Sequence, residues 1–310
     1  MARVIFMGTP EFAVPTLQAL DNHHQVVGVV TQPDRPAGRG RKLTASPVKE
    51  LALSRGLEVY QPRKLIDPAA AQRLADWQPE VIVVAAFGQL LPPSVLELPP
   101  HGCLNIHGSL LPRYRGAAPI SAAILAGDET TGVTLMLMDE GMDTGPILAQ
   151  AEQAIGPSDT TASLTQELAG LGAQLLTSTL PAWLAGRITP QPQDDSQATY
   201  CRMLRKEDGR LDWTRSARHL DRQVRACDPW PGAYTRWQGQ RLKVLRVYPR
   251  PDWSGPGSPG QVLELDPGVG VVTGQGALEL LEVQLAGRKP TDIEPFSHGQ
   301  RDFVGSVLGA

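Results

Sequence analysis

The stretch GCLNIHGSLLPRYRG, residues 102–116, begins as a short strand at 103–107 and continues as a loop that contains glycine and proline. Side chains along a strand alternate between its two faces, so Asn105 and His107 share one face and their apolar neighbours share the other. In open α/β sheets, ligands bind beside the ends of the strands. An amide donor next to an imidazole could stabilise an oxyanion and move a proton, although the same two side chains could simply cap a loop.

The residues before this stretch predict alternating strands and helices. Apolar runs predict strands at residues 3–7, 25–31, 57–60 and 81–86, and helical spacing predicts helices at 12–20, 48–55 and 68–77. Pro10 suits a first helical turn, so we expect Thr9 to cap the first helix, and we expect Ser46 to cap the second. Strands that are apolar throughout are typical of parallel strands buried on both faces. The pattern therefore predicts a Rossmann-like, doubly wound α/β domain.

The residues after this stretch extend the domain. We expect a helix at 117–126, strands at 132–138 and 147–154, the second of them antiparallel, and a closing helix at 161–184. The turn between these two strands holds three carboxylates, Asp139, Glu140 and Asp143. If the strand at 132–138 lies beside Asn105 and His107, one of these carboxylates can reach the imidazole. Spacing alone does not select among them, and ordinary turn chemistry explains them too.

A basic segment, QPDRPAGRGRKLTASPVK, covers residues 32–49. Its one acidic residue is Asp34, and its basic residues are Arg35, Arg39, Arg41, Lys42 and Lys49. Its glycines and prolines predict a long exposed loop, and loops of this length are usually functional or disordered. The segment could contact a phosphate backbone, or its charges could serve only to keep it solvated.

The second half of the chain predicts a smaller domain. Residues 189–205 are polar and contain prolines, so we interpret them as a linker between a domain at 1–188 and a domain at 206–310. A helix at 216–226 precedes short strands at 234–237, 242–248, 261–265, 269–273 and 277–283, a pattern that indicates a small β-barrel. Residues 206–250 carry 11 Lys and Arg against five Asp and Glu, which suits an RNA backbone.

Composition excludes several classes of protein. The three cysteines are few, odd in number and widely spaced, so they provide neither a disulfide framework nor a zinc site. Gly8 stands alone after the first strand, which argues against a nicotinamide or flavin cofactor. No apolar run approaches the ~20 residues of a membrane helix, and no signal segment is recognisable. We therefore expect a reduced, cytoplasmic protein. We also expect a monomer that binds no metal.

Long segments of the chain resemble the formyltransferase family that uses 10-formyltetrahydrofolate. NIHGSLLPRYRGAAPI is similar to the signature of that family, and MDEGMDTG is similar to its acidic active-site turn. FMGTPEFAVPTL and the basic segment resemble the members whose acceptor is the initiator methionyl-tRNA. Tyr114 and Arg41 stand where relatives often differ, and neither position carries the chemistry in that family.

The resemblance implies roles for individual residues. The matching catalytic triad is Asn105, His107 and Asp143. The positions that correspond to folate contacts are Ser109, Leu110, Leu111 and Pro112 in the signature, and Phe87, Gly88, Gln89 and Leu90 after the fourth strand. Those that correspond to contacts with the acceptor stem of the tRNA are Arg35, Arg39, Arg41 and Lys42. The resemblance also implies that the C-terminal barrel is OB-like, and that 10-formyltetrahydrofolate is a co-substrate.

Three other functions compete with this interpretation. A related folate-dependent formyltransferase acting on a small amine, such as an amino sugar or glycinamide ribonucleotide, would share the triad but would have no use for the basic segments. A non-catalytic RNA-binding protein would not need Asn105, His107 and Asp143. A Rossmann dehydrogenase lacks support, because the glycine fingerprint is missing.

Overall fold

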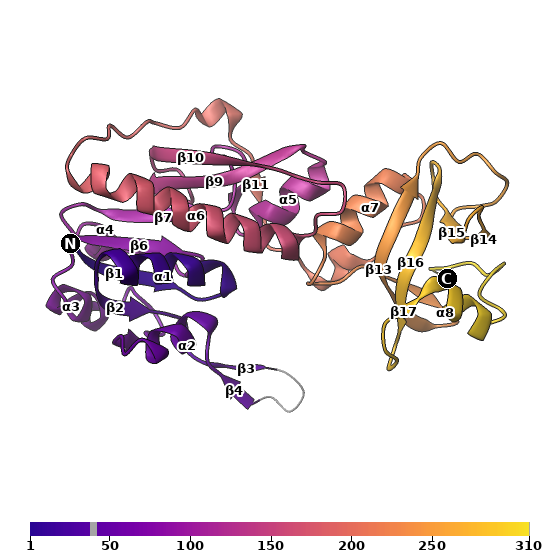
Figure 1. Ribbon diagram of the computed structural model, residues 1–310, viewed down its shortest axis with the longest axis horizontal. Helices are drawn as coiled ribbons and strands as arrows, with labels where there is room; N and C mark the ends of the chain where they lie inside the picture. Colours follow the sequence, from indigo (N-terminus) through magenta and orange to yellow (C-terminus); the bar gives the residue numbers. More distant parts are fainter. Residues whose placement is uncertain (38–41, 310) are drawn as a thin grey trace. The chain divides into compact units, whose positions relative to one another are not determined.

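The computed structural model describes residues 1–37 and 42–309, which form two compact units (Figure 1). The first unit comprises Met1–Pro119, Thr130–Ala154 and Thr165–Cys201. The second comprises Ile120–Glu129, Ile155–Leu164 and Arg202–Ala310. All the residues that the sequence predicts to be catalytic or to contact folate belong to the first unit.

A seven-stranded sheet forms the centre of the first unit, in the order β10-β9-β7-β6-β1-β2-β5. In chain order, the strands are β1 (Arg3–Gly8), β2 (Gln25–Val30), β5 (Val59–Tyr60), β6 (Val81–Ala85), β7 (Cys103–His107), β9 (Thr130–Leu137) and β10 (Ile147–Ala154). The five strands that lie side by side as β5-β2-β1-β6-β7 are parallel to one another, and the pairs β7–β9 and β9–β10 are antiparallel. The predicted α/β sheet is therefore confirmed, including the antiparallel return at β10.

Helices cover both faces of this sheet, as a doubly wound fold requires (Figure 1). The helices of this unit are α1 (Val14–His23), α2 (Pro47–Ser54), α3 (Pro68–Asp76), α4 (Pro93–Leu96) and α6 (Thr161–Leu184), which begins in the second unit. α5 (Pro119–Ala126) lies in the second unit except for Pro119. Ile106 faces α6, because a Cβ on Gly172 would lie only 2.7 Å from its side chain. Cys103 faces α4, where its thiol lies 3.5 Å from the Val95 carbonyl. Asn105 and His107 follow Cys103 at two-residue intervals along β7, so their side chains lie on the same face of the sheet as Cys103.

The first helix does not begin as the sequence predicts. A 3-10 turn, η1 (Glu11–Ala13), follows Pro10, and α1 starts only at Val14 with no side-chain cap. The Thr9 hydroxyl instead donates to the Phe87 carbonyl at 3.1 Å, so the expected cap is wrong. The prediction for Ser46 is confirmed, because its hydroxyl accepts from the Lys49 amide at the start of α2.

The basic segment contains a short antiparallel ladder rather than only loop. β3 (Arg35–Ala37) pairs with β4 (Lys42–Thr44), and Lys49 forms an ion pair with Asp34 at 2.7 Å beside the ladder. Arg39 and Arg41 lie outside the described residues. Proline and glycine interrupt the segment and hide the alternation by which a strand is recognised in sequence.

Another short pair joins distant parts of the first unit. β8 (Arg115–Gly116) runs parallel to β11 (Tyr200–Cys201), which follows the 3-10 turn η2 (Asp195–Gln197). Two-residue strands have no periodicity, so the sequence could not predict them. Their pairing brings part of the segment interpreted as a linker against residues 102–116.

The second unit contains a curled antiparallel sheet, in agreement with the predicted small barrel (Figure 1). Its strands are β12 (Tyr234–Trp237), β13 (Gln240–Arg250), β16 (Ala277–Leu285), β15 (Val269–Val272) and β14 (Val262–Glu264), with β17 (Thr291–Asp292) paired to β16. Its helical elements are η3 (Lys206–Gly209), α7 (Ala217–Ala226) and α8 (Ile293–Gly299). Trp237, Phe296 and Phe303 pack edge to face within its core.

Candidate active site

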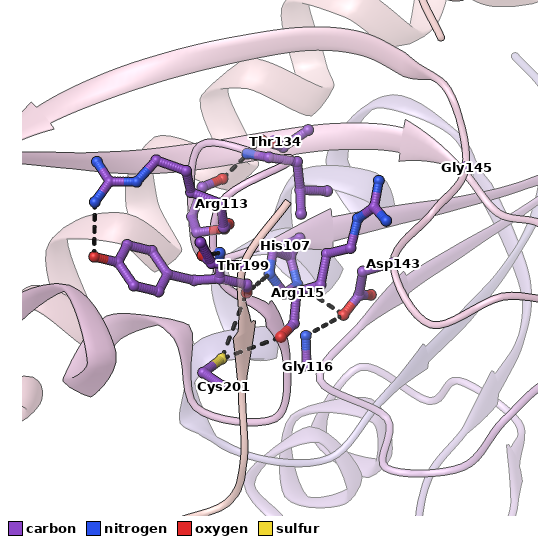
Figure 2. Close-up of polar contacts among 12 residues, drawn as sticks. His107, Arg113, Arg115, Gly116, Thr134, Asp143, Gly145, Thr199 and Cys201 are labelled. Atoms are coloured by element: carbon purple, nitrogen blue, oxygen red, sulfur yellow. Dashed lines mark hydrogen bonds and ion pairs between the residues drawn. The ribbon is translucent and has the colours of Figure 1, made fainter. Parts of the chain in front are cut away.

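The His107 imidazole lies at the carboxyl end of β7 with polar partners at both ring nitrogens. Its Nε2 lies 2.9 Å from the Tyr114 carbonyl oxygen, and because a carbonyl only accepts, Nε2 carries the proton and donates. Its Nδ1 faces Asp143 Oδ2 at 3.7 Å (Figure 2). The side chain is 7% exposed, so these protein groups, rather than water, fix the orientation of the ring.

Asp143 is the carboxylate of the acidic turn that lies beside the imidazole. Its Oδ2 also accepts the Gly116 N–H at 2.8 Å, as Figure 2 shows. Asp139 instead stabilises the turn itself, accepting from the Gly141 N–H and the Thr144 hydroxyl. Glu140 is exposed. The structure therefore separates three carboxylates that spacing alone left equivalent.

The Asn105 side chain lies on β7 one repeat before His107 and is half-buried. The backbone around it is fixed by pairing with Val84 of β6 and Met136 of β9. Within the described residues its amide has no hydrogen-bond partner, so its N–H groups are available to a bound molecule.

The loop after β7 is held by hydrogen bonds within the protein. Ser109 is fully buried, and its hydroxyl donates to the Arg113 carbonyl at 2.7 Å. Thr134 of β9 donates to the Ser109 carbonyl and accepts from the Leu111 N–H. Gln150 of β10 donates to the Leu111 carbonyl at 2.9 Å. The Ser109 hydroxyl therefore stabilises the loop.

The segment after β6 is anchored by the ends of two neighbouring strands. The buried Phe87 offers its carbonyl to the Thr9 hydroxyl after β1 and to the Gln32 amide after β2, at 3.1 and 3.3 Å. The Gln89 side chain accepts from the Leu65 N–H. Leu90 is 74% exposed. Any ligand of this segment must therefore meet Gly88–Leu90 rather than the occupied Phe87 carbonyl.

The sequence missed a group of site residues in the segment after α6. The Gln193 amide donates to the carbonyls of Asp143 and Gly145, at 2.8 and 2.7 Å. The Thr199 hydroxyl accepts from the Tyr114 N–H at 2.8 Å. The Cys201 thiol lies near the Tyr114 carbonyl, and burial, together with the negative charge of Asp143, raises its pKa. The polar composition that indicated a linker gave no signal of these contacts.

Basic residues expected to contact RNA lie on both units. Arg35 is exposed and donates only weakly, at 3.4 Å, to Gln32. For Lys42, the structure describes the backbone pairing with Ala37. In the second unit, Arg210 and Arg236 line a shallow pocket with Tyr234, and Arg241 lies 3.8 Å from the centre of the Tyr234 ring. Within the described part of the chain, none of these three arginines forms an ion pair with a carboxylate.

Two absences concern only residues 1–37 and 42–309. No three His, Cys, Asp or Glu side chains gather there in a group that could hold a metal ion. None of the helices there combines the length and apolar composition that a membrane span requires.

Comparison with known proteins identifies relatives over nearly the whole chain. A family model described as formyl transferase matches residues 2–180, and one described as formyl transferase, C-terminal domain, matches residues 203–301. A methionyl-tRNA formyltransferase of Myxococcus xanthus is 51% identical over 305 residues, covering 98% of this chain and 97% of the relative. That of Chloroflexus aurantiacus (strain ATCC 29366) is 52% identical over 292 residues, covering 93% and 94%.

Solved structures show the same fold at lower sequence identity. WlaRD, a sugar 3N-formyl transferase, superposes with a TM-score of 0.67 at 17% identity, covering 93% of this chain and 99% of that one. HypX from Aquifex aeolicus in complex with tetrahydrofolic acid gives a TM-score of 0.63 at 20% identity, covering 98% of this chain and 48% of that one. At these identities the likeness concerns the fold alone.

Proposed function

The chain belongs to the formyl transferase family, and we propose that it transfers the formyl group of 10-formyltetrahydrofolate to the α-amino group of methionine on initiator methionyl-tRNA. The observation that carries this proposal is the identity of about half, over nearly the full length of both chains, to methionyl-tRNA formyltransferases. The product, formylmethionyl-tRNA, serves translation initiation, so we propose a cytoplasmic enzyme, and we propose that it acts as a monomer.

The proposed chemistry is attack of the α-amine on the formyl carbon. A new N–C bond forms and the bond from the formyl carbon to N10 of the folate breaks. The amine gives up a proton and N10 takes one up, so tetrahydrofolate leaves. Negative charge develops on the formyl oxygen between these steps. The unpartnered Asn105 amide is placed to donate to this oxygen, and a donor of that kind contributes ~3 kcal/mol to the transition state.

His107 and Asp143 would act as a pair in this reaction. Asp143, 3.7 Å from Nδ1, orients the ring and helps to take the proton of the amine, directly or through water. The Nε2–H of His107 is donated to the Tyr114 carbonyl. For His107 to assist Asn105 at the oxyanion, this N–H must exchange the carbonyl for the formyl oxygen.

The folate would lie between the two loops at the carboxyl ends of β6 and β7. Phe87–Leu90 and Ser109–Pro112 form these loops. The carbonyls of Leu110, Leu111 and Pro112 already accept from Arg113, Gln150 and Thr199, so the segment Gly88–Leu90 offers the exposed groups. A flat pterin ring suits contact with exposed backbone groups on one side and Leu90 on the other. We propose these residues as the folate site.

The acceptor tRNA would be held by positive charge from both units. We propose that Arg35, Arg39, Arg41 and Lys42 contact its acceptor stem, and that Arg210, Arg236 and Arg241 add phosphate contacts. We retain residues 1–188 as the catalytic domain and 206–310 as the tRNA-binding domain. Residues 189–205 connect them, and Gln193 and Thr199 of this connection also contact the site.

The test is formyl transfer in vitro. Purified protein is incubated with 10-formyltetrahydrofolate and methionine-charged initiator tRNA, the ester is hydrolysed, and N-formylmethionine is measured by mass spectrometry. We expect formylmethionine in amounts that depend on enzyme, folate and charged tRNA. No formylmethionine from correctly folded protein would refute the proposal.

A further inference from the structure

One side-chain amide bridges two carbonyl groups of the acidic turn. Gln193 Nε2 lies 2.8 Å from the Asp143 carbonyl oxygen and 2.7 Å from that of Gly145. An amide nitrogen carries two hydrogens, so each carbonyl can receive one of them. The contact joins the main chain on both sides of residue 144 and therefore fixes the path of the turn at Asp143.

A buried arginine fixes which end of the Gln193 amide faces the turn. Gln193 Oε1 accepts from Arg115 Nε at 3.1 Å and from Arg115 Nη2 at 2.8 Å. A guanidinium can only donate and the two carbonyls can only accept, so a flipped amide would lose all four hydrogen bonds. The Gln193 side chain therefore has a single orientation in which every partner is satisfied.

The arginine is itself held tightly. The Arg115 side chain is 2% exposed, and its remaining donors meet Asp195 at 2.6 Å and the Tyr200 hydroxyl at 3.3 Å. The Arg115 N–H donates to the Thr199 carbonyl in the short β8–β11 pairing. Arg115 thus provides a rigid base against which Gln193 holds the turn.

Asp143 is a residue whose conformation needs such support. Its φ of 56° lies in the left-handed region, which side chains other than glycine rarely adopt. Gly116 donates to its carboxylate and Asp139 accepts from Gly141 and Thr144, but neither contact reaches the carbonyls of Asp143 and Gly145, which Gln193 bridges. Tyr114, in the same segment, accepts from His107. Within residues 114–116, Tyr114 therefore holds His107 and Gly116 holds the Asp143 carboxylate. Arg115 holds the Asp143 main chain indirectly, through Gln193.

We infer that Gln193 is a positioning residue, which with Arg115 clamps the acidic turn so that the Asp143 carboxylate faces His107; this inference rests on the proposed function. Gln193 supports catalysis by holding the main chain at Asp143, and its own hydrogen bonds do not involve the side chains of Asn105, His107 or Asp143. Loss of Gln193 affects the chemical step, because His107 and Asp143 lose their mutual geometry. Binding of folate and tRNA, which involves other residues, changes little.

Two substitutions separate the clamp from simple packing. Gln193→Ala removes the bridge, while Gln193→Glu keeps the size and the acceptor for Arg115 but faces two carbonyls with a group that cannot donate. We expect both to lower kcat by about 10- to 100-fold with each KM changed less than about threefold. The matched control is Gln191→Ala, because among the described residues the exposed side-chain amide of Gln191 donates only to the Thr189 carbonyl. A Gln193→Glu variant with the kcat of the wild type would overturn the clamp.

A double-mutant cycle shows whether Gln193 acts through Asp143. In an Asp143→Asn background, Gln193→Ala is expected to lower kcat by less than about threefold, because the effects of residues that act as a unit are not additive. A full further loss of 10-fold or more in that background would overturn the inference. Thermal unfolding of each variant confirms that the proteins compared are folded.

The Gly116 amide reports the clamp without any substrate. Its N–H donates to Asp143 Oδ2, so its ¹H chemical shift in an NMR spectrum depends on where that carboxylate lies. We expect Gln193→Ala and Asp143→Asn to move this resonance in the same direction, and Gln191→Ala to leave it in place. An unmoved resonance in Gln193→Ala would overturn the clamp. If the wild-type protein transfers no formyl group but this shift is observed, the proposed function fails and the clamp stands.

Discussion

At the scale of single residues, two side chains of the proposed site have sharply different environments. His107 is enclosed, with the Tyr114 carbonyl on one side and Asp143 on the other. Asn105 has no partner within the described residues and is therefore the donor that is free without rearrangement. The sequence predicts all three triad residues from the motifs, but it does not indicate that His107 already donates its Nε2–H to main chain.

The first prediction concerns Asp143. Asp143→Asn keeps the size of the side chain and removes the charge that faces His107 Nδ1, so we expect kcat to fall by about 10²- to 10³-fold with little change in stability. Steady-state kinetics with methionyl-tRNA give kcat, and urea unfolding gives the stability. Turnover within about threefold of the wild type would show that Asp143 has no part in the chemistry.

The second prediction concerns the Cys201 thiol beside the site. Burial and the Asp143 charge raise its pKa, so at neutral pH it is protonated and reacts slowly with iodoacetamide. The rate should rise as the pH increases toward that pKa. Asp143→Asn removes one of the two causes and should accelerate the reaction at a fixed pH. Peptide mass spectrometry assigns the modified cysteine; equal rates in both proteins would contradict the placement of Asp143 beside Cys201.

At the scale of elements, the sequence predicted strands and helices wherever periodicity or apolar runs extend over several residues. β7, β10 and α6 have the predicted bounds, because a buried strand or a long helix repeats its pattern often enough to be recognised. β8 and β11 have two residues each, and their pairing depends on residues about 85 positions apart along the chain. That contact exists only in the folded chain, so Gln193 and Thr199 could not be assigned to the site.

The third prediction tests the β8–β11 pairing. Gly116 has a φ of 113°, and a Cβ there would lie 2.4 Å from the Cys201 carbonyl oxygen. We expect Gly116→Ala to lower the free energy of unfolding by about 2 kcal/mol or more, because strain and a backbone clash combine. Gly186→Ala is the control, since Gly186 has a φ of 68° but open space around it. Equal losses in the two variants, measured by urea unfolding, would contradict the pairing.

At the scale of the whole molecule, charge is unevenly distributed over a chain whose net charge is only −3. Residues 206–250 carry an excess of six positive charges, whereas residues 251–310 carry three Lys and Arg against eight Asp and Glu. Arg246 and Arg250 are neutralised by Glu282, Asp292 and Glu279. Arg210, Arg236 and Arg241 form no ion pair in the described part of the chain, which leaves their charge available to phosphates.

The fourth prediction follows from this distribution. Binding of methionyl-tRNA should weaken steeply with salt, because each phosphate contact releases counterions, while the KM for the folate should change little. Arg236→Gln should weaken tRNA binding and lower the slope of log K against log salt by about 1. Arg246→Gln is the control, since that side chain is already paired with two carboxylates. A binding constant independent of salt, from filter binding or anisotropy, would contradict the proposed RNA contacts.

The central claim is the choice of acceptor, and its most direct test is a ratio of catalytic efficiencies. kcat/KM is measured for methionine-charged initiator tRNA and for a nucleotide-linked amino sugar, with 10-formyltetrahydrofolate as the donor in both reactions. The basic segment and the basic residues 206–250 predict that kcat/KM for the tRNA exceeds that for the sugar by at least about 10³-fold. Efficient formylation of the amino sugar with no transfer to the tRNA would contradict the account.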